Sequence, residues 1–452
     1  MASLYNTFGN CFKIPELKSR ILFTAALLAI CRVIAFIRVP GLDAEALKTT
    51  MEKATSGGAM GMYNLFTGGA LEHAAVGALG IMPYISATII VQLLTAVVPQ
   101  LSKLAREEGG RAKIIQYGRY LTVGLCLLQG AFIVFGWEKP DESGKNLMLY
   151  APEYIWWYRI QALLVLTTGT MLLMWLGEQI TERGIGNGVS LVITIGIVAR
   201  LPKAVQGLQD MFFPAAGAEP KNLGHAVALI LLLVGVIAGV IAVTQAQRKI
   251  PVQYAQRAVG RKVYSGGTSF MPLRVNYAGV MPIIFAGAIL SFPQQLAARA
   301  GTYLDLPFLM KIGRALTEGT FLYLFIYGLM ILFFSYFWVA TQFNELQIAD
   351  DLKKNGGYIP GVRPGQATSE FLHHAMTRIT LAGALFLTVI AIIPIILTQL
   401  MTITPDVAQF FGGTSMLITV GVMLDTMRQV ESHLMMRHYD GFLKKGRLRG
   451  RF

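Results

Sequence analysis

The chain has 452 residues, of which 54% are hydrophobic and only 14% are charged, and its formal net charge is +14. Soluble domains carry about 25% charged residues, so this composition excludes an ordinary soluble globular protein and favours a membrane protein. The three cysteines, Cys11, Cys31 and Cys126, are scattered and match neither a disulfide framework nor a metal site.

Ten long stretches with almost no charged side chains predict membrane-spanning helices. A bilayer core about 30 Å thick needs about 20 apolar residues in a helix, whereas a β-barrel would show alternating segments of about 10 residues. The two shortest stretches could instead be buried or re-entrant segments. In chain order the ten are 21–37, 74–101, 120–137, 160–177, 184–199, 222–247, 275–298, 319–344, 379–405 and 407–424.

The first stretch is expected to stay in the mature protein. Lys13, Lys18 and Arg20 precede it, and no small-residue cleavage site follows a short apolar core. Arg32 is the one charged residue inside a predicted span. We therefore expect a retained helix rather than a cleaved signal peptide.

The distribution of charge predicts the orientation of the chain. If all ten stretches span and the N-terminus is cytoplasmic, the cytoplasmic segments hold 26 Lys/Arg and 12 Asp/Glu. The external segments then hold 12 Lys/Arg and 13 Asp/Glu, so nearly the whole positive excess lies on one side. Short cytoplasmic loops are enriched in Lys and Arg, and this predicts that both termini are cytoplasmic.

Two predicted cytoplasmic loops, 248–274 and 345–378, are longer than simple turns. The first contains six Lys/Arg and no acidic residue, and its sequence IPVQYAQRAVGRKVY combines alternation with a glycine-containing turn. This pattern predicts a β-hairpin that projects from the membrane. A basic loop can be a simple topology anchor, but Tyr254 and Tyr264 among the arginines also suit a nucleic-acid backbone or an acidic protein surface.

A short motif occurs twice, as GIMPYISA at 80–87 and as GVMPIIFA at 279–286. The copies lie in the second and seventh predicted spans, five places apart in the order of spans, so they would cross the membrane in opposite directions, as in an inverted repeat. The expected fold is an all-α membrane protein with ten transmembrane helices in two inverted five-helix halves. Proline inside a span removes a hydrogen bond, so we expect both motif helices to bend at this point. The apolar lining predicts a hydrophobic constriction rather than an ion site.

Other classes of membrane protein fit the sequence less well. A secondary transporter would carry ionisable groups at mid-membrane, where only Arg32 is found. An intramembrane enzyme would need a motif such as His-Glu-x-x-His or a Ser-His dyad, and the exposed-loop pair His373 and His374 is not one. The glycine-rich segment 184–188 lacks the Gly-Lys-Ser/Thr ending of a phosphate loop. We expect no enzyme activity, no cofactor and no metal.

Seven segments resemble the SecY family, the large channel subunits of Sec protein translocons, along nearly the full chain. One departure is Glu345, which stands where the family commonly has proline, so the sequence leaves the exit of the eighth span open. The segments are NLFTGGALE (64–72), ALGIMPYISATIIVQLLT (78–95), MWLGEQITERGIGNGVSLVI (174–193), RKIPVQYAQRAVGRKVY (248–264), PLRVNYAGVMPIIFAGAILSFP (272–293), GYIPGVRPGQAT (357–368) and FGGTSMLITVGVMLD (411–425).

The resemblance implies a central pore, closed by a ring of aliphatic side chains and by a small plug. The plug corresponds to 60–72, on the external side of the ring. The residues that match the ring are Ile81, Ile85, Val189, Ile193, Ile284 and Ile418. Those that match the plug are Tyr63, Asn64, Phe66, Thr67, Gly68 and Gly69.

The resemblance also implies a lateral gate between the second and seventh spans and a cytoplasmic docking surface. Gln92 and Asn276 could instead be ordinary residues that hydrogen-bond between helices. The gate residues are Pro83, Ser86, Gln92, Asn276, Pro282 and Phe285. The docking residues are Arg257, Arg261, Lys262 and Arg363, the last in the stiff tip IPGVRPG.

The organisation that follows is a set of segments with distinct expected roles. The function implied is passage of unfolded secretory proteins across the bacterial inner membrane and lateral release of hydrophobic segments. The implied partners are SecE, SecG, the motor ATPase SecA, the ribosome, signal peptides, unfolded preproteins and lipid, with SecDF and YidC as further candidates. The segments are a cytoplasmic N-terminus (1–20), an N-terminal half (21–199), an external hinge loop (200–222), a C-terminal half (223–436) and a basic cytoplasmic tail (437–452).

Overall fold

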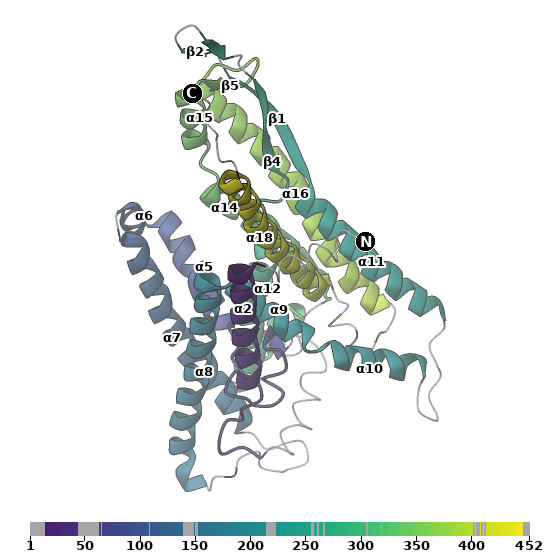
Figure 1. Cartoon of the computed structure of the whole chain (residues 1–452). Helices are drawn as coiled ribbons and strands as arrows, with labels where there is room; N and C mark the ends of the chain where they lie inside the picture. Colours follow the sequence, from purple (N-terminus) through teal and green to yellow (C-terminus); the bar gives the residue numbers. More distant parts are fainter. Residues whose placement is uncertain are drawn as a thin grey trace.

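The computed structural model is a mostly helical molecule from which a narrow β-sheet projects (Figure 1). Residues 1–13, 44–62 and 446–452 are among the segments outside the description. The described residues are 14–43, 63–64, 66–107, 109–138, 149, 152–213, 223–254, 257–259, 262–264, 267–303, 306–317, 319–400, 403, 407, 410 and 413–445.

The first half of the chain forms a group of helices in which α7 packs on both α5 and α8. α5 ends at Val97 and α6 then leaves at an angle of 103°, so the predicted span 74–101 is helical only from Met82. The predicted hinge 200–222 is also partly helical, as α10. The helices are α2 (Pro15–Ile34), α5 (Met82–Val97), α6 (Pro99–Arg106), α7 (Gly110–Trp137), η1 (Pro152–Tyr154), α8 (Ile155–Arg183), α9 (Gly188–Val198) and α10 (Leu201–Phe212).

The second half forms a separate group in Figure 1, where α11, α16 and α18 run obliquely beside one another and make mutual contacts. The tail predicted to begin at 437 is helical as far as Lys445, because α18 continues well beyond the apolar stretch. The helices are α11 (Leu223–Gln245), α12 (Met281–Tyr303), α13 (Pro307–Ala315), α14 (Phe321–Gln342), α15 (Glu345–Lys354), α16 (Gln366–Leu400) and α18 (Gly413–Lys445).

The exit of the eighth span, left open by Glu345, is a turn closed by a capping residue. Asn344 follows α14 and accepts a hydrogen bond at 3.2 Å from the backbone N–H of Gln347, which starts α15. Glu345 itself lies 2.9 Å from Nδ1 of His373 on α16. His373 is exposed, as expected, but it lies on the helix α16 rather than in an irregular loop.

The predicted hairpin in loop 248–274 is confirmed, and it joins the other long loop. β1 (Gln247–Tyr254) pairs antiparallel with β4 (Thr268–Arg274), and its outer end also pairs with β5 (Gly357–Tyr358). The hairpin continues outward as β2 (Arg257–Val259) and β3 (Lys262–Tyr264). Ile250 and Leu273 on the inner face of the sheet share a hydrophobic cluster with Ile359 and with α16. The two predicted loops are therefore one folded unit.

The repeated motif has the same backbone conformation in both copies. Gly80 and Gly279 have φ values of +58° and +61°, a region that strongly favours glycine. Met82 and Met281 then open α5 and α12, with proline in the second helical position of each. The expectation that Pro83 and Pro282 bend a helix is wrong, because the first turn needs no N–H from these residues and proline starts a helix there.

Within the described residues, six helical segments are long and apolar enough to cross a membrane, or seven if the bent pair α5 and α6 counts as one. α2, α12 and α18 overlap the three remaining predicted stretches without meeting that criterion. The mostly helical, membrane-spanning class is therefore confirmed. The number of ten spans in two inverted halves stays a prediction.

Candidate functional site

Six aliphatic side chains, on or directly before α5, α9, α12 and α18, belong to one large hydrophobic cluster. Five are isoleucines with at most 3% of their surface exposed, namely Ile81, Ile85, Ile193, Ile284 and Ile418. Val189 packs against this cluster and is half-buried. All six residues that matched the ring thus lie in one cluster, on helices from both ends of the chain.

The contact of this group with α8 is close because α8 has a glycine there. A Cβ placed on Gly177 would lie 3.6 Å from Cδ1 of Ile81 and 3.6 Å from Cγ2 of Val189. Ile81 and Val189 therefore approach the same point of α8 from α5 and α9. These aliphatic side chains offer no hydrogen bond, so the surface they present to α8 is apolar.

The segment 63–74 packs against the same cluster through Tyr63, Phe66 and Leu71. Tyr63 and Phe66 are 5% exposed, and the Tyr63 hydroxyl donates to the backbone oxygen of Leu79 at 2.9 Å. Phe66 reaches α12, since a Cβ on Gly287 would lie 4.0 Å from its Cζ. The six residues that matched the plug are all buried, and we call segment 63–74 the plug segment from here on.

The plug segment meets α9 backbone to backbone. Gly68 has φ +66°, and a Cβ on it would lie 2.7 Å from Cα of Gly196 on α9. Any side chain at Gly68 would therefore both strain the backbone and collide with α9. Arg32, near the end of α2, donates to the backbone oxygen of Gly68 at 3.0 Å.

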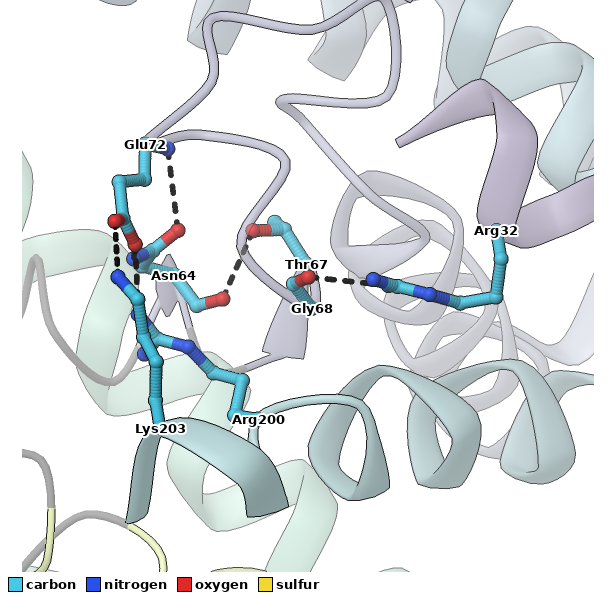
Figure 2. A network of polar contacts seen from close by, with 7 residues as sticks. All are labelled: Arg32, Asn64, Thr67, Gly68, Glu72, Arg200 and Lys203. Atoms are coloured by element: carbon cyan, nitrogen blue, oxygen red, sulfur yellow. Dashed lines mark hydrogen bonds and ion pairs between the residues drawn. The ribbon is translucent and has the colours of Figure 1, made fainter. Parts of the chain in front are cut away.

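A polar network fixes the far end of the plug segment, as Figure 2 shows. Glu72 is 3% exposed, and its Oε2 accepts from Arg200 at 2.9 Å and from the Asn64 amide at 3.2 Å. Lys203 pairs with the other carboxylate oxygen. Asn64 also accepts from the backbone N–H of Glu72 at 3.2 Å, which ties the segment to itself.

Sequence reasoning did not identify Glu72, Arg200 and Lys203 as site residues. Glu72 belonged to a recognised segment, but its partners follow it by 128 and 131 residues. The available signal was Arg200 directly after an apolar stretch. A single cation next to a predicted span could pair with many acidic residues, so the sequence does not predict which one Arg200 contacts.

The surroundings of Glu72 decide its protonation. Burial raises the pKa of the carboxyl, but the hydrogen bond and charge of Lys203, the charge of Arg200 and the Asn64 amide together bring the pKa below its ordinary value. A carboxyl with a lowered pKa stabilises the fold above the unfolded pKa, about 4.3 for Glu. That stabilisation is lost only as pH falls through the lower, folded pKa.

We therefore expect Glu72 to stay ionised on mild acidification. Infrared spectra should therefore show Glu72 ionised at both about pH 7 and about pH 5. At neither pH should the parent protein have a protonated-carboxyl band that is missing from Glu72→Gln. The same band should grow only at a pH below the ordinary pKa of a glutamate. A Glu72-dependent band already present at about pH 5 would contradict the ion pairing.

The residues that matched the gate lie on or beside α5 and α12, which contact each other. Pro83, Pro282 and Phe285 are buried, Ser86 is half-buried and Gln92 is exposed. The Phe285 ring packs against Phe334 and Trp338 of α14, at centroid distances of 5.9 and 5.4 Å.

Asn276 lies before α12, not within it. Its amide donates at 2.8 Å to the backbone oxygen of Gly279, in the turn that leads into the helix. The structure therefore gives Asn276 a contact within its own turn, and it places Gln92 on the exposed side of α5.

The three described residues that matched the docking surface lie on the outer parts of the two long loops. Arg257 and Lys262 pair with their neighbours in the outer hairpin of β2 and β3, and Arg261 lies outside the described residues. Arg363 is exposed, and its backbone oxygen accepts from the Thr368 hydroxyl at 2.8 Å. Because β1 pairs with β5, the sheet brings these two loops together.

Comparison with known proteins agrees with this arrangement. The protein-family model for SecY matches residues 75–427. Protein translocase subunit SecY of Thermotoga maritima is 41% identical over 457 residues, covering 99% of this chain and 100% of the relative.

Two solved structures share the fold. The structure of a protein-conducting channel is 19% identical, covers 93% of this chain and 96% of its own, and has a TM-score of 0.61. A second, in which the plug domain of SecY stabilises the closed state of the translocation channel and maintains a membrane seal, is 19% identical over 94% and 96% of the two chains with a TM-score of 0.59.

Proposed function

This chain belongs to the SecY family, and from this premise we propose that it is the central subunit of a protein-conducting channel. It passes unfolded secretory proteins across the membrane and releases hydrophobic segments sideways into the bilayer. The family consists of protein-translocation channels rather than enzymes, so no catalytic residue is assigned.

The observation that carries the proposal is the apolar cluster of ring residues with the plug segment packed against it. A closed ring of branched aliphatic side chains gives a hydrated ion no hydrogen bonds and loses its water. The same ring deforms around an unfolded chain, because apolar contacts are non-directional. Tyr63 and Phe66 of the plug segment add a second apolar barrier.

Lateral release is supported by the contact between α5 and α12. Each helix starts at the repeated motif, directly after a glycine with positive φ, so each has a natural pivot at that end. A hydrophobic segment that enters the seam gains about 25 cal/mol per Å² of apolar surface moved into lipid. Opening this seam would make α5 and α12 the lateral gate.

The orientation and the partners follow from charge and family. The basic hairpin at β2 and β3 and the exposed Arg363 support docking of acidic or phosphate-bearing partners, which we assign as SecA and the ribosome. We further propose SecE and SecG as companion subunits, and SecDF and YidC as accessory ones. The excess of Lys and Arg on one side supports the bacterial inner membrane with both termini in the cytoplasm.

Reconstitution tests the proposal directly. Vesicles that contain the protein with its companion subunits should import a signal-bearing precursor when the motor ATPase and ATP are added. A precursor that lacks its signal is the control and should stay outside. Absence of import by well-inserted protein would contradict the channel function.

The docking role of the loop tip predicts that Arg363→Glu lowers motor-driven import at least about tenfold without loss of fold. Reversal of an exposed loop charge usually changes stability by no more than about 0.5 kcal/mol. Lys354→Glu is the matched control, because Lys354 is an exposed cation on α15 of the same loop. Import at the parental rate with Arg363→Glu, or equal loss with Lys354→Glu, would remove Arg363 from the docking surface.

A further inference from the structure

The ion pairs of Glu72 connect the plug segment to the junction between α9 and α10. Arg200 lies between the two helices, and Lys203 lies in the first turn of α10. The carboxylate comes from a different part of the chain and receives both cations on its two oxygens. Figure 2 shows the two cations converging on Glu72 from one side, while Asn64 approaches from the plug segment.

The junction between α9 and α10 carries an excess of positive charge, and the plug segment supplies the negative charge that neutralises it. The N-terminus of a helix carries a partial positive charge, and acidic residues normally stabilise it. α10 has no acidic residue in its first turn and no side-chain cap, and Arg200 and Lys203 add two positive charges there. The carboxylate of Glu72 is therefore the group that balances the junction while the plug segment is docked.

Burial makes this balance sensitive to the position of the plug segment. The side chains of Glu72 and Arg200 are 3% and 9% exposed, whereas Lys203 is 42% exposed. A buried charge that loses its partner is strongly destabilised, so the pair favours the docked position over any position in between. Against α9 the segment has only the close backbone approach of Gly68 to Gly196, so the ion pairs are the charged contacts that join it to the junction after α9.

We propose that Glu72, Arg200 and Lys203 form an ionic latch that holds the plug segment in the closed channel. The latch rests on the proposed channel function and adds positioning residues to it. Opening separates the carboxylate from both cations and exposes all three to water. The strength of the latch therefore sets how often the resting channel opens.

Ion conductance of resting channels in planar bilayers tests the latch. Glu72→Gln keeps the shape of the side chain but removes its charge, and we expect conductance to rise at least about tenfold. Import of a signal-bearing precursor should persist, which a general loss of structure would not allow. Glu138→Gln is the matched control, because Glu138 forms a similar pair with Arg159 at 2.7 Å between α7 and α8 and should leave conductance unchanged.

A double-mutant cycle separates the latch from a local packing defect. If Glu72 and Arg200 act together, Glu72→Gln with Arg200→Gln should leak no more than the leakier single variant. If the fold-increases in conductance of the two single variants multiply in the double variant, the two residues act independently and the latch is overturned. If Glu72→Gln fails to fold, Lys203→Gln at the half-exposed position should give a smaller rise in the same direction.

The outcomes separate the latch from the channel itself. Parental conductance in Glu72→Gln and Lys203→Gln, with normal import, would overturn the latch and leave the channel function standing. Failure of the parent protein to import any precursor would overturn the channel function, and the latch with it. A rise in Glu138→Gln equal to that in Glu72→Gln would show that any broken ion pair loosens the channel.

Discussion

Oxidation of a cysteine pair that joins α5 to α12 should stop import of signal-bearing precursors, and reduction should restore it. The two helices already touch in the closed channel, so the crosslinked protein should still fold. If the lateral gate opens between them, a covalent bond prevents the separation that admits a signal sequence. We expect import to fall to background while the bond is intact.

The structure narrows the choice of positions for that pair. Ser86 and Thr88 on α5 are half-buried, and Ile289 on α12 packs partly buried against the central cluster. Phe285 is a poor site, because its ring contacts Phe334 and Trp338. Disulfides need Cα atoms about 4.4–6.8 Å apart, so each pair should first be tested for efficient oxidation.

A crosslink inside one group of helices is the control for that experiment. Gly239 on α11 faces Ile390 on α16, where a Cβ on Gly239 would lie 3.4 Å from Cγ1 of Ile390. Cysteines at these two positions should form a disulfide that leaves import unchanged. The three native cysteines are replaced first in all variants. Normal import through a verified bond between α5 and α12 would show that the gate lies elsewhere.

Shortening two ring residues together, Ile85→Ala with Ile284→Ala, should make the resting channel leak ions strongly while import continues. The side chains are 3% and 2% exposed and come from the two copies of the repeated motif. Their loss widens the constriction from both sides and lets water remain in it. We expect resting conductance to rise by more than about tenfold, measured in planar bilayers.

Two neighbouring isoleucines outside the ring provide a control, because their replacement by alanine should destabilise the protein to a similar degree. Ile89 on α5 and Ile283 on α12 are each 1% exposed and belong to the same cluster but not to the ring. Large-to-small core changes cost about 2–5 kcal/mol each, so Ile89→Ala with Ile283→Ala loosens packing to a similar degree. Equal leakage from both double variants would mean that any loosening opens the pore.

Features of this fold that arise from local sequence patterns could be predicted from the sequence. Apolar stretches located the helices, and alternation around a glycine predicted the hairpin of β1 and β4. The repeated motif predicted two equivalent places in the structure, and Gly80 and Gly279 share one backbone conformation. These features depend on neighbours in sequence, where helix and strand periodicities act.

Features that depend on distant partners were missed or misjudged. The bend expected at Pro83 and Pro282 is absent because both prolines open a helix, and nothing local marks where a helix within an apolar stretch begins. Such a stretch also hides the 103° turn after Val97. The pairing of Glu72 with Arg200 depends on how α9 and α10 sit beside the plug segment, which tertiary packing alone decides.

The sheet of β4, β1 and β5 connects both long loops to the start of the helix α12. β1 follows α11 directly, and the backbone N–H of Val275 donates to the oxygen of Ala246 at 2.9 Å, which pins the base of the hairpin. The strand β4 ends at Arg274, and α12 begins at Met281. Because β1 also pairs with β5, both long loops are joined to this base, and we expect a partner bound to either loop to act on the segment that leads into α12. Two binding partners of different size and shape can thus deliver the same mechanical input to one helix.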